Sequence, residues 1–344
     1  MAHYLITGHT GFKGAWLISL LKARGHEVSG IALDPLEGSL FSRAGMADDL
    51  EHDYRVDIRD YEKTISAFTQ IQPDYVIHMA AQALVREGYR NPVYTYETNV
   101  NGTLNILRSV DETDSVRSHL VVTTDKVYLN QGLGRPYQEG DPLGGKDPYS
   151  ASKAMADILA QEWMARKGAK RGAVVRAGNV IGAGDSSIDR LMPDIVRSMK
   201  NGETIKIRYP NAVRPWQHVL DCLEAYLIVL NGVEYREVSR VWNIGPKSVS
   251  YSSVSEILRL AKNLAPEWVH QIEEVVPNLP EDGFLALDAS QAATVLGWRE
   301  RFSLEMALTD ALAEGREFMA WDPRGHVEKT VAQFVGLAPE AISL

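Results

Sequence analysis

The sequence predicts an α/β fold: a doubly wound parallel sheet covered by helices on both faces, with a smaller, mostly C-terminal α/β lobe. In the first half of the chain, short apolar runs alternate with segments of helical period. These runs are continuous, as in strands that are buried on both faces. The 344 residues suffice for about two domains of roughly 150 residues each.

The expected elements follow one another in order. Apolar and β-branched runs predict strands in the first half, and apolar residues at helical spacing predict helices between them. Strands are expected at His3–Thr7, Glu27–Ala32, Tyr75–Met79, Leu120–Thr123 and Ala173–Arg176, and helices at Gly14–Arg24, Tyr61–Thr69, Asn99–Val110 and Pro148–Arg166. The second half is less regular, because Pro and Gly interrupt it more often. There, helices are expected at Asp189–Asn201, Val219–Val233 and Ser252–Leu264, and strands at Thr204–Arg208 and Val241–Ile244.

Composition excludes several classes of function. The 36 Lys and Arg residues face 45 Asp and Glu residues, so the formal charge is −9, which disfavours a nucleic-acid partner. The single cysteine, Cys222, excludes an intramolecular disulfide and a Cys-rich metal cluster, and it fits a reducing compartment. No leader pattern or membrane-length apolar run is present. We expect a cytoplasmic protein without a metal site or membrane contact.

A glycine loop follows the first expected strand, in the run Gly8-His-Thr-Gly11-Phe-Lys13-Gly14. Glycines let backbone N–H groups and the next helix N-terminus approach a pyrophosphate. Asp34 lies 20 residues beyond Gly14, where a carboxylate bonds ribose hydroxyls and repels a 2′-phosphate. The pattern predicts a Rossmann-type domain that binds NAD. Lys13 either neutralises the pyrophosphate or is a solvated surface lysine.

Tyr149 and Lys153 are four residues apart and therefore share one face of a helix. An ammonium group beside a phenol lowers the pKa of the phenol, which makes it a usable base for a sugar hydroxyl. Combined with the glycine loop, this spacing resembles the short-chain dehydrogenase/reductase superfamily. Its extended branch shares the Gly-x-x-Gly-x-x-Gly spacing and acts on nucleotide sugars.

The run Thr124-Asp125-Lys126 ends the strand before that helix. In the superfamily, the hydroxyl residue here bonds the substrate oxygen that is oxidised, and a following acid and base are typical of 4,6-dehydratases. Other stretches narrow the resemblance, over residues 1–325, to the CDP-glucose 4,6-dehydratase family. They are Asp57–Asp60, His78–Gln82, Leu84–Arg86, Tyr94–Val100, Arg176–Gly182, Asp189–Ile195 and Arg214–Val219.

The resemblance implies the residues of the site. The implied catalytic set is Thr124, Asp125, Lys126, Tyr149 and Lys153. The implied cofactor set is Gly8, Thr10, Gly11, Phe12, Lys13, Gly14, Asp34, Asp57, Ile58, Ala80, Ala81, Asn99, Tyr149 and Lys153. The implied substrate set is Gln82, Arg86, Asn179, Arg190, Arg208 and Arg214, in which the planar fork of arginine suits a diphosphate. Surface ion pairing explains Arg190 and Arg208 equally well.

The implied reaction converts CDP-glucose to CDP-4-keto-6-deoxyglucose, for deoxysugar synthesis toward surface polysaccharide. The sugar is oxidised at C4, loses water across C5 and C6, and regains the hydride at C6. Lys126 is the expected C5 base and Asp125 the expected acid. Asp125 must then stay protonated and Lys126 neutral, against ordinary pKa values of about 3.9 and 10.4. Burial favours both states, whereas pairing of the two groups opposes both.

Several alternatives stay open. Departures from the family pattern at Leu129–Leu133, Ser186 and Pro280–Phe284 leave other nucleotide hexoses as substrates: GDP-mannose, UDP-N-acetylglucosamine or dTDP-glucose. A nucleotide-sugar epimerase or reductase would keep the scaffold, and a regulatory protein that senses NAD would lack turnover. The resemblance also implies a homodimer, or a higher homo-oligomer, built on a four-helix bundle of the segments Asn99–Val110 and Pro148–Arg166.

We assign residues 1–178 to the NAD-binding domain, with segments near 214–246 returning to it. Residues 179–325 are assigned mainly to the lobe that binds the nucleotide sugar. Residues 326–344 form a tail without an assigned role.

Overall fold

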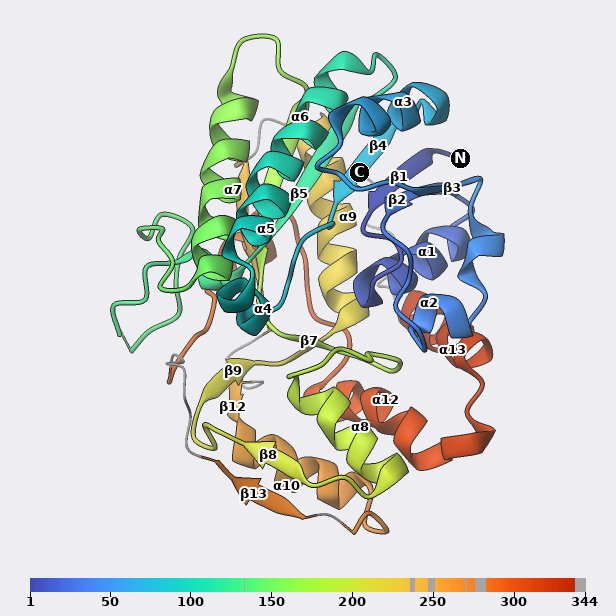
Figure 1. Ribbon diagram of the computed structural model, residues 1–344, viewed down its shortest axis with the longest axis vertical. Coiled ribbons are helices and arrows are strands. Elements are labelled where there is room, and N and C mark those ends of the chain that lie inside the picture. The colour runs from blue at the N-terminus through green and yellow to red at the C-terminus, as the bar shows by residue number, and fades with distance from the viewer. Residues whose placement is uncertain (133, 236–238, 247–250, 270, 276–282, 338–344) are drawn as a thin grey trace.

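The computed structural model describes residues 1–344 except 133, 236–238, 247–250, 270, 276–282 and 338–344. Seven strands form its main sheet: β1 (His3–Thr7), β2 (Glu27–Ala32), β3 (His52–Arg55), β4 (Tyr75–His78), β5 (Ser118–Thr124), β6 (Arg171–Ala177) and β11 (Val241–Ile244). Their order is β11-β6-β5-β4-β1-β2-β3, and all neighbours pair in parallel (Figure 1). The predicted fold class is confirmed.

Helices cover both faces of this sheet (Figure 1). Helices α1 (Phe12–Ala23) and α9 (Val219–Tyr235) lie on one face, with α13 (Pro323–Gly336) packed against α1. Helices α3 (Tyr61–Ile71), α6 (Gly102–Glu112) and α7 (Pro148–Ala165) cover the other face. Side chains of successive strand residues point to opposite faces, so Tyr4 and Ile6 join the α1 core while Leu5 joins the α3 core.

Among the residues that the structure describes, the smaller lobe contains three two-stranded sheets. In these sheets β7 (Val180–Ile181) pairs with β10 (Gln217–His218), β8 (Ile205–Ile207) with β13 (Ile272–Glu274), and β9 (Val213–Pro215) with β12 (Tyr251–Ser253). Helices α8 (Leu191–Asn201), α10 (Val254–Leu264) and α12 (Leu304–Glu317) surround a second apolar core. That core includes Ile195, Trp216, Ile257 and Leu308.

Short helical segments connect these elements. They are α2 (Leu40–Arg43), α4 (Val85–Arg90), α5 (Pro92–Tyr96), α11 (Ser290–Val295), a π-helical turn η2 (Glu97–Asn101), and the 3₁₀ turns η1 (Met46–Asp49), η3 (Asp125–Val127) and η5 (Phe318–Ala320). Much of the tail that the sequence left unassigned belongs to α13, and residues 338–344 lie outside the described residues.

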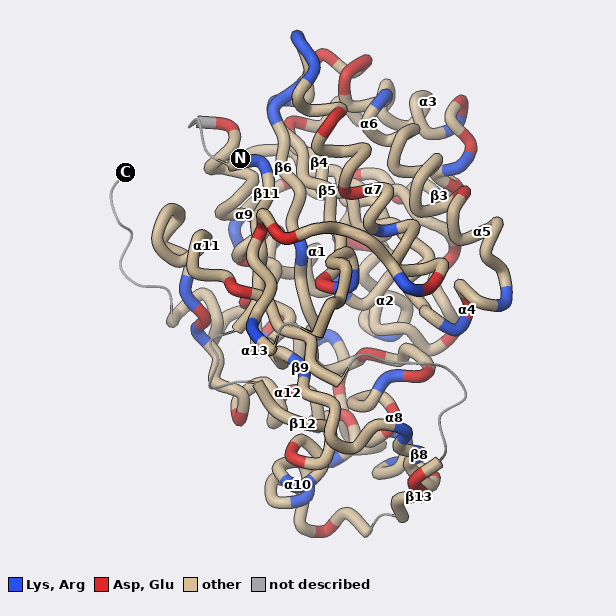
Figure 2. The backbone as a smooth tube through the Cα atoms, turned by 90° about the vertical axis from the view of Figure 1, so that its left-hand side faces the viewer, with Lys and Arg blue, Asp and Glu red and all other residues tan. Residues whose placement is uncertain are grey.

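The strand order reverses between β1 and β4, where chains of this fold bind ligands at the carboxyl ends of the strands. Acidic and basic positions are interspersed over both parts of the molecule, so the net negative charge is not gathered in one place (Figure 2). Among the described residues, no helix combines the length and apolarity needed to cross a bilayer.

Candidate active site

The glycine loop lies between β1 and α1 and forms a close-packed cradle. Gly8 has a φ of +78°, and a Cβ there would lie 2.8 Å from the backbone nitrogen of Ala80, which with Ala81 follows β4. A Cβ at Gly14 would lie 2.6 Å from the carbonyl oxygen of Gly8. Gly11 caps α1 without a side chain, which leaves the first N–H groups of the helix to an anion. These features fit the pyrophosphate of NAD.

Two polar side chains of the loop contact other parts of the protein. The Thr10 hydroxyl donates to the carbonyl oxygen of Leu33 at 3.1 Å, which ties the loop to the end of β2. Lys13 Nζ donates to the hydroxyl of Tyr226 on α9 at 3.0 Å. Phe12, at the start of α1, packs partly buried against the core of that face. The ammonium of Lys13 is therefore held beside the helix N-terminus.

The predicted acidic positions lie past the ends of β2 and β3. The Asp34 side chain is 89% exposed, and its Oδ1 lies 3.6 Å from Nε of Arg55. Partial burial acts to raise the pKa of Asp57, but hydrogen bonds and charge from Arg59 outweigh it and lower that pKa. Ile58 is buried beside them. The exposed Asp34 is thus available as a hydrogen-bond acceptor for ribose hydroxyls, whereas both oxygens of Asp57 accept from Arg59.

Asn99 joins the loop after β4 to α7. Its Oδ1 accepts from the backbone nitrogen of Gln82 at 2.8 Å, and its Nδ2 donates to the Ser152 hydroxyl at 2.9 Å. The amide of Gln82 is also occupied within the protein, since Nε2 donates to Thr95 Oγ1 at 2.8 Å and Oε1 accepts from the nitrogen of Leu84 at 2.6 Å. Both side chains therefore shape the loop. The contact of Gln82 with the sugar stays a prediction.

Tyr149 and Lys153 lie in the first turns of α7. Lys153 is 5% exposed, and its Nζ donates to the carbonyl oxygen of Val122 at 2.8 Å. Burial lowers the pKa of Lys153 to about 8, although the charge of Asp157 opposes this. Lys153 is therefore largely a cation at neutral pH.

Burial raises the pKa of the half-buried Tyr149 to about 12, against a hydrogen bond with Thr124 and the charge of Arg190. The direction is opposite to the one predicted from the Tyr-x-x-x-Lys spacing. The physical reason is that burial is the largest influence on the phenol, and Thr124 and Arg190 offset it only in part. The contact with Thr124 brings two residues of the predicted catalytic set together.

Asp125 is buried directly after β5. The Thr124 hydroxyl donates to its Oδ1 at 2.9 Å, whereas its Oδ2 has no hydrogen-bond partner among the described residues. Burial raises the pKa of Asp125, against the opposing effects of Lys126 and Thr124. A Cβ at Gly178 would lie 3.3 Å from Oδ2, so a glycine gives this carboxyl its space. Asp125 is thus a buried acid with a raised pKa, and the adjacent Lys126 is half exposed.

Three of the four predicted arginines gather around the loop before α8. Arg86 Nη1 lies 2.8 Å and Arg208 Nη2 3.5 Å from Oδ1 of Asp189, which has a φ of +59°. Arg190 lies 3.9 Å from Asp185. The sequence did not single out either aspartate as a site residue. Three guanidinium groups against two carboxylates leave a local excess of positive charge, which suits a diphosphate.

The fourth arginine, Arg214, is 5% exposed on β9 and donates from Nη1 to the carbonyl oxygen of Val213 at 2.8 Å. Its charge acts to lower the pKa of Asp125, so the guanidinium lies within electrostatic reach of the buried acid. The carbonyl oxygen of Asn179 accepts from the nitrogen of Gln217 at 3.3 Å. Arg214 and Asn179 therefore border the same strand ends as Asp125.

One further set of residues was not predicted. Arg176 and Asp157 form a buried ion pair behind the site, with side-chain exposures of 2% and 0%. Two signals in the sequence point to it: an arginine within an apolar strand, and an aspartate one helical turn after Lys153. A charge inside an apolar element needs a buried partner.

Comparison with known proteins agrees with an NAD-binding site at the glycine loop. The model of the NAD dependent epimerase/dehydratase family matches residues 4–245. CDP-glucose 4,6-dehydratase of Salmonella typhimurium is 39% identical over 314 residues, which cover 88% of this chain and 87% of that protein.

Two solved structures share the fold. UDP-glucose 4-epimerase from Thermotoga maritima, with UDP-glucose, superposes with a TM-score of 0.80 at 23% identity, over 92% of this chain and 99% of that one. dTDP-glucose 4,6-dehydratase from Bacillus anthracis, in complex with NAD, also gives 0.80 at 23% identity, over 94% and 100%.

Proposed function

Because the chain belongs to the NAD-dependent epimerase/dehydratase family, with NAD as its cofactor, we propose that it is a CDP-glucose 4,6-dehydratase. Its product is then CDP-4-keto-6-deoxyglucose, a precursor for deoxysugars of surface polysaccharide. The nucleotide and the hexose are carried over from the 39% identical relative. The type of reaction rests on the groups at the end of β5.

The first half of the reaction oxidises C4 of the hexose. The glycine loop and the N-terminus of α1 would hold NAD, which would supply the acceptor for the C4 hydride and the donor for its return to C6. Tyr149 takes the proton of the C4 hydroxyl, to which Thr124 also forms a hydrogen bond. Lys153, a cation below a pKa of about 8, favours the charged form of the phenol.

The second half removes water across C5 and C6. The C4 ketone makes the C5 proton acidic, and Lys126 takes that proton. Asp125 gives its proton to the C6 hydroxyl, which leaves as water. After the hydride has returned to C6, Lys126 returns its proton to C5. Tyr149 releases to solvent the proton that it took from the C4 hydroxyl, and Asp125 regains one proton from solvent, so the net change is the loss of one water.

Asp125 is the observation that carries this proposal. It is 3% exposed, burial raises its pKa, and one of its oxygens has no partner within the described chain. Such a carboxyl stays protonated to higher pH than an exposed one, as a general acid requires. An epimerase or a reductase needs no acid at C6, so a buried carboxyl here favours the dehydratase.

Product analysis tests the proposal. Purified protein with NAD is incubated separately with CDP-glucose, dTDP-glucose, GDP-mannose and UDP-N-acetylglucosamine, and the products are identified by mass and NMR. We expect CDP-glucose to lose the mass of one water and to gain a keto group, without net reduction of NAD. A product of unchanged mass with inverted C4 would identify an epimerase. Faster water loss from another nucleotide hexose would reassign the substrate, and binding without turnover would favour a regulatory role.

We also propose that the enzyme is a cytoplasmic homodimer. Met155 and Ile158 are 49% and 55% exposed on α7, in one of the two segments expected to form the intersubunit helix bundle. Covering such apolar side chains favours association. The buried thiol of Cys222 suits a reducing compartment. Light scattering of the purified protein measures the oligomeric state, and a monomer would contradict the dimer.

A further inference from the structure

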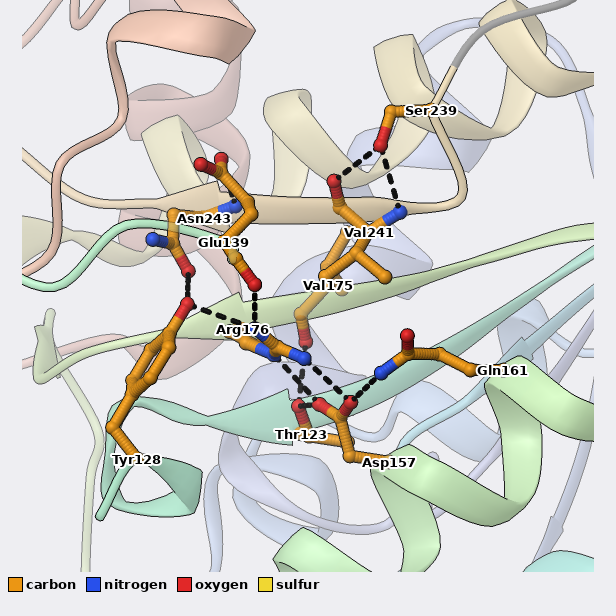
Figure 3. A network of polar contacts seen from close by, with 10 residues as sticks. All are labelled: Thr123, Tyr128, Glu139, Asp157, Gln161, Val175, Arg176, Ser239, Val241 and Asn243. Atoms are coloured by element: carbon orange, nitrogen blue, oxygen red, sulfur yellow. Dashed lines mark hydrogen bonds and ion pairs between the residues drawn. The ribbon is translucent and has the colours of Figure 1, made fainter. Parts of the chain in front are cut away.

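A network of buried polar side chains connects α7, β6 and the segment after β5 (Figure 3). At its centre, Arg176 donates from Nε to Oδ2 and from Nη2 to Oδ1 of Asp157, both at 2.8 Å. The same carboxylate accepts from the Thr123 hydroxyl at 2.9 Å and from Gln161 Nε2 at 2.6 Å. Four donors thus hold the carboxylate, and two of them belong to the bidentate ion pair that fixes the guanidinium plane.

The remaining nitrogen of Arg176 reaches the other side of the network. Nη1 donates to the hydroxyl of Tyr128 and to the carbonyl oxygen of Glu139, each at 2.9 Å. The Tyr128 hydroxyl in turn donates to Oδ1 of Asn243 at 2.6 Å, and its ring stacks on Tyr137 at 5.0 Å. Tyr128 is 2% exposed, so both its hydroxyl and its ring are held in place.

Each side of the network carries one half of the proposed chemistry. Asp157 lies one helical turn beyond Lys153 and two beyond Tyr149, on the same face of α7. Tyr128 directly follows η3, and its backbone nitrogen donates to the carbonyl oxygen of Asp125 at 3.5 Å. The guanidinium of Arg176 therefore connects α7, which carries Tyr149 and Lys153, to η3, which carries Asp125 and Lys126.

We propose that Arg176 and Tyr128 are positioning residues that fix Asp125 relative to Tyr149. This inference rests on the proposed function, in which one bound sugar meets the C4 base and the C6 acid in succession. Because the sugar is not released between the two steps, the distance between these groups has to be held by the protein. Neither Arg176 nor Tyr128 needs to contact the substrate for this role.

The variant Tyr128→Phe separates the two halves of the network. It keeps the ring and its stacking on Tyr137, and Arg176 keeps Asp157 and the Glu139 carbonyl, so the chain is expected to fold. We expect C4 oxidation to continue while water loss slows by about 10- to 100-fold, the scale of a misplaced catalytic group. The near-ultraviolet absorbance of reduced nicotinamide then accumulates during turnover, and KM for the nucleotide sugar stays unchanged.

Two readouts are independent of turnover. Hydrogen–deuterium exchange of residues 125–128 should rise in Tyr128→Phe, and NAD affinity, measured by tryptophan fluorescence, should not change. Tyr137→Phe is the matched control, because it removes one hydroxyl from the ring that stacks on Tyr128. The Tyr137 hydroxyl donates to Asn130 Oδ1 at 2.9 Å and not to a member of the Arg176 network. We expect the ratio of the rates of oxidation and water loss in Tyr137→Phe to equal that of the unmodified protein.

The outcomes separate this inference from the proposed function. If the unmodified protein forms keto sugar and Tyr128→Phe loses water at the same rate, only the inference is overturned. An equal decline of oxidation and water loss in Tyr128→Phe also overturns it, because the tyrosine then supports the fold alone. If the unmodified protein forms no keto sugar from any nucleotide hexose, the proposed function fails and the inference with it.

Discussion

Replacing Arg176 with methionine removes the cation of the buried ion pair and keeps an unbranched apolar side chain. Arg176 is 1% exposed, so the new side chain stays within the core. Asp157 keeps its hydrogen bonds from Thr123 and Gln161 and loses the two from the guanidinium. A fully buried carboxylate then remains without its arginine.

The expected cost follows from these contacts. Removing one partner of a buried ion pair costs about 3–5 kcal/mol, because the other charge stays desolvated. Two of the four donors to Asp157 remain, so we expect the lower part of that range, about 3–4 kcal/mol. Natural domains are stable by only about 5–15 kcal/mol, so the variant loses a large share of its stability.

Urea denaturation followed by circular dichroism measures this loss as a shift of the midpoint. The double variant Arg176→Met with Asp157→Leu serves as the control, because replacing both charges with apolar groups costs less than stranding one of them. Stability of Arg176→Met equal to that of the unmodified protein would refute the reasoning. A double variant less stable than Arg176→Met would refute it as well.

The other predictions concern the reaction. In Lys126→Ala, oxidation at C4 should continue, but water loss should be at least about 10²-fold slower. The C5 proton of the sugar should then no longer exchange with solvent deuterium. Full retention of turnover would exclude Lys126 as the C5 base. Tyr149→Phe should lose both steps by about 10²- to 10⁴-fold, since oxidation precedes elimination, and near-normal dehydration by product mass would contradict this role. Water loss needs a neutral Lys126 and a protonated Asp125 at the same pH, so its rate in single-turnover experiments should pass through a maximum. On the alkaline side the rate should fall as the pH rises through the pKa of Asp125, which burial raises. A rate that rises with pH over that range would contradict the acid role.

Sequence patterns predicted the buried strands of the main sheet. They missed elements that are held in place by neighbouring strands or helices. Strand β3 (His52–Arg55) was not predicted, because its residues are polar and largely exposed. It is an edge strand held by backbone pairing with β2, and neither of its faces requires apolar side chains. Helices α12 and α13 were also not predicted; α12 lies in the segment assigned to the substrate lobe, and most of α13 lies in the tail that was left without a role.

The helix expected at Asn99–Val110 begins differently from its prediction. A π-helical turn, Glu97–Asn101, precedes α6, and Asn99 within it bonds Gln82, 17 residues away. Apolar periodicity does not reveal such a turn, because its partner lies in another loop. The contact joins Asn99 to the backbone of Gln82 and so ties the loop after β4 to this turn.

The catalytic candidates could be found because they lie in short contiguous patterns, such as Tyr149 and Lys153 or Asp125 and Lys126. The supporting network could not. Arg176 and Asp157 are 19 residues apart, and Arg176 and Tyr128 are 48 apart. Only the parallel pairing of β5 with β6, which brings Thr123 opposite Arg176, makes these residues neighbours.

The two halves of the proposed reaction make opposite demands on charge, and burial alone meets only one of them. Asp125 has to stay neutral, and burial raises its pKa accordingly. Lys153 has to stay charged, although burial lowers its pKa to about 8. The carboxylate of Asp157, one turn away on α7, acts to raise the pKa of Lys153 and thereby keeps the cation at neutral pH. Because Arg176 holds that carboxylate, the ion pair that positions the site also sustains the charge of Lys153.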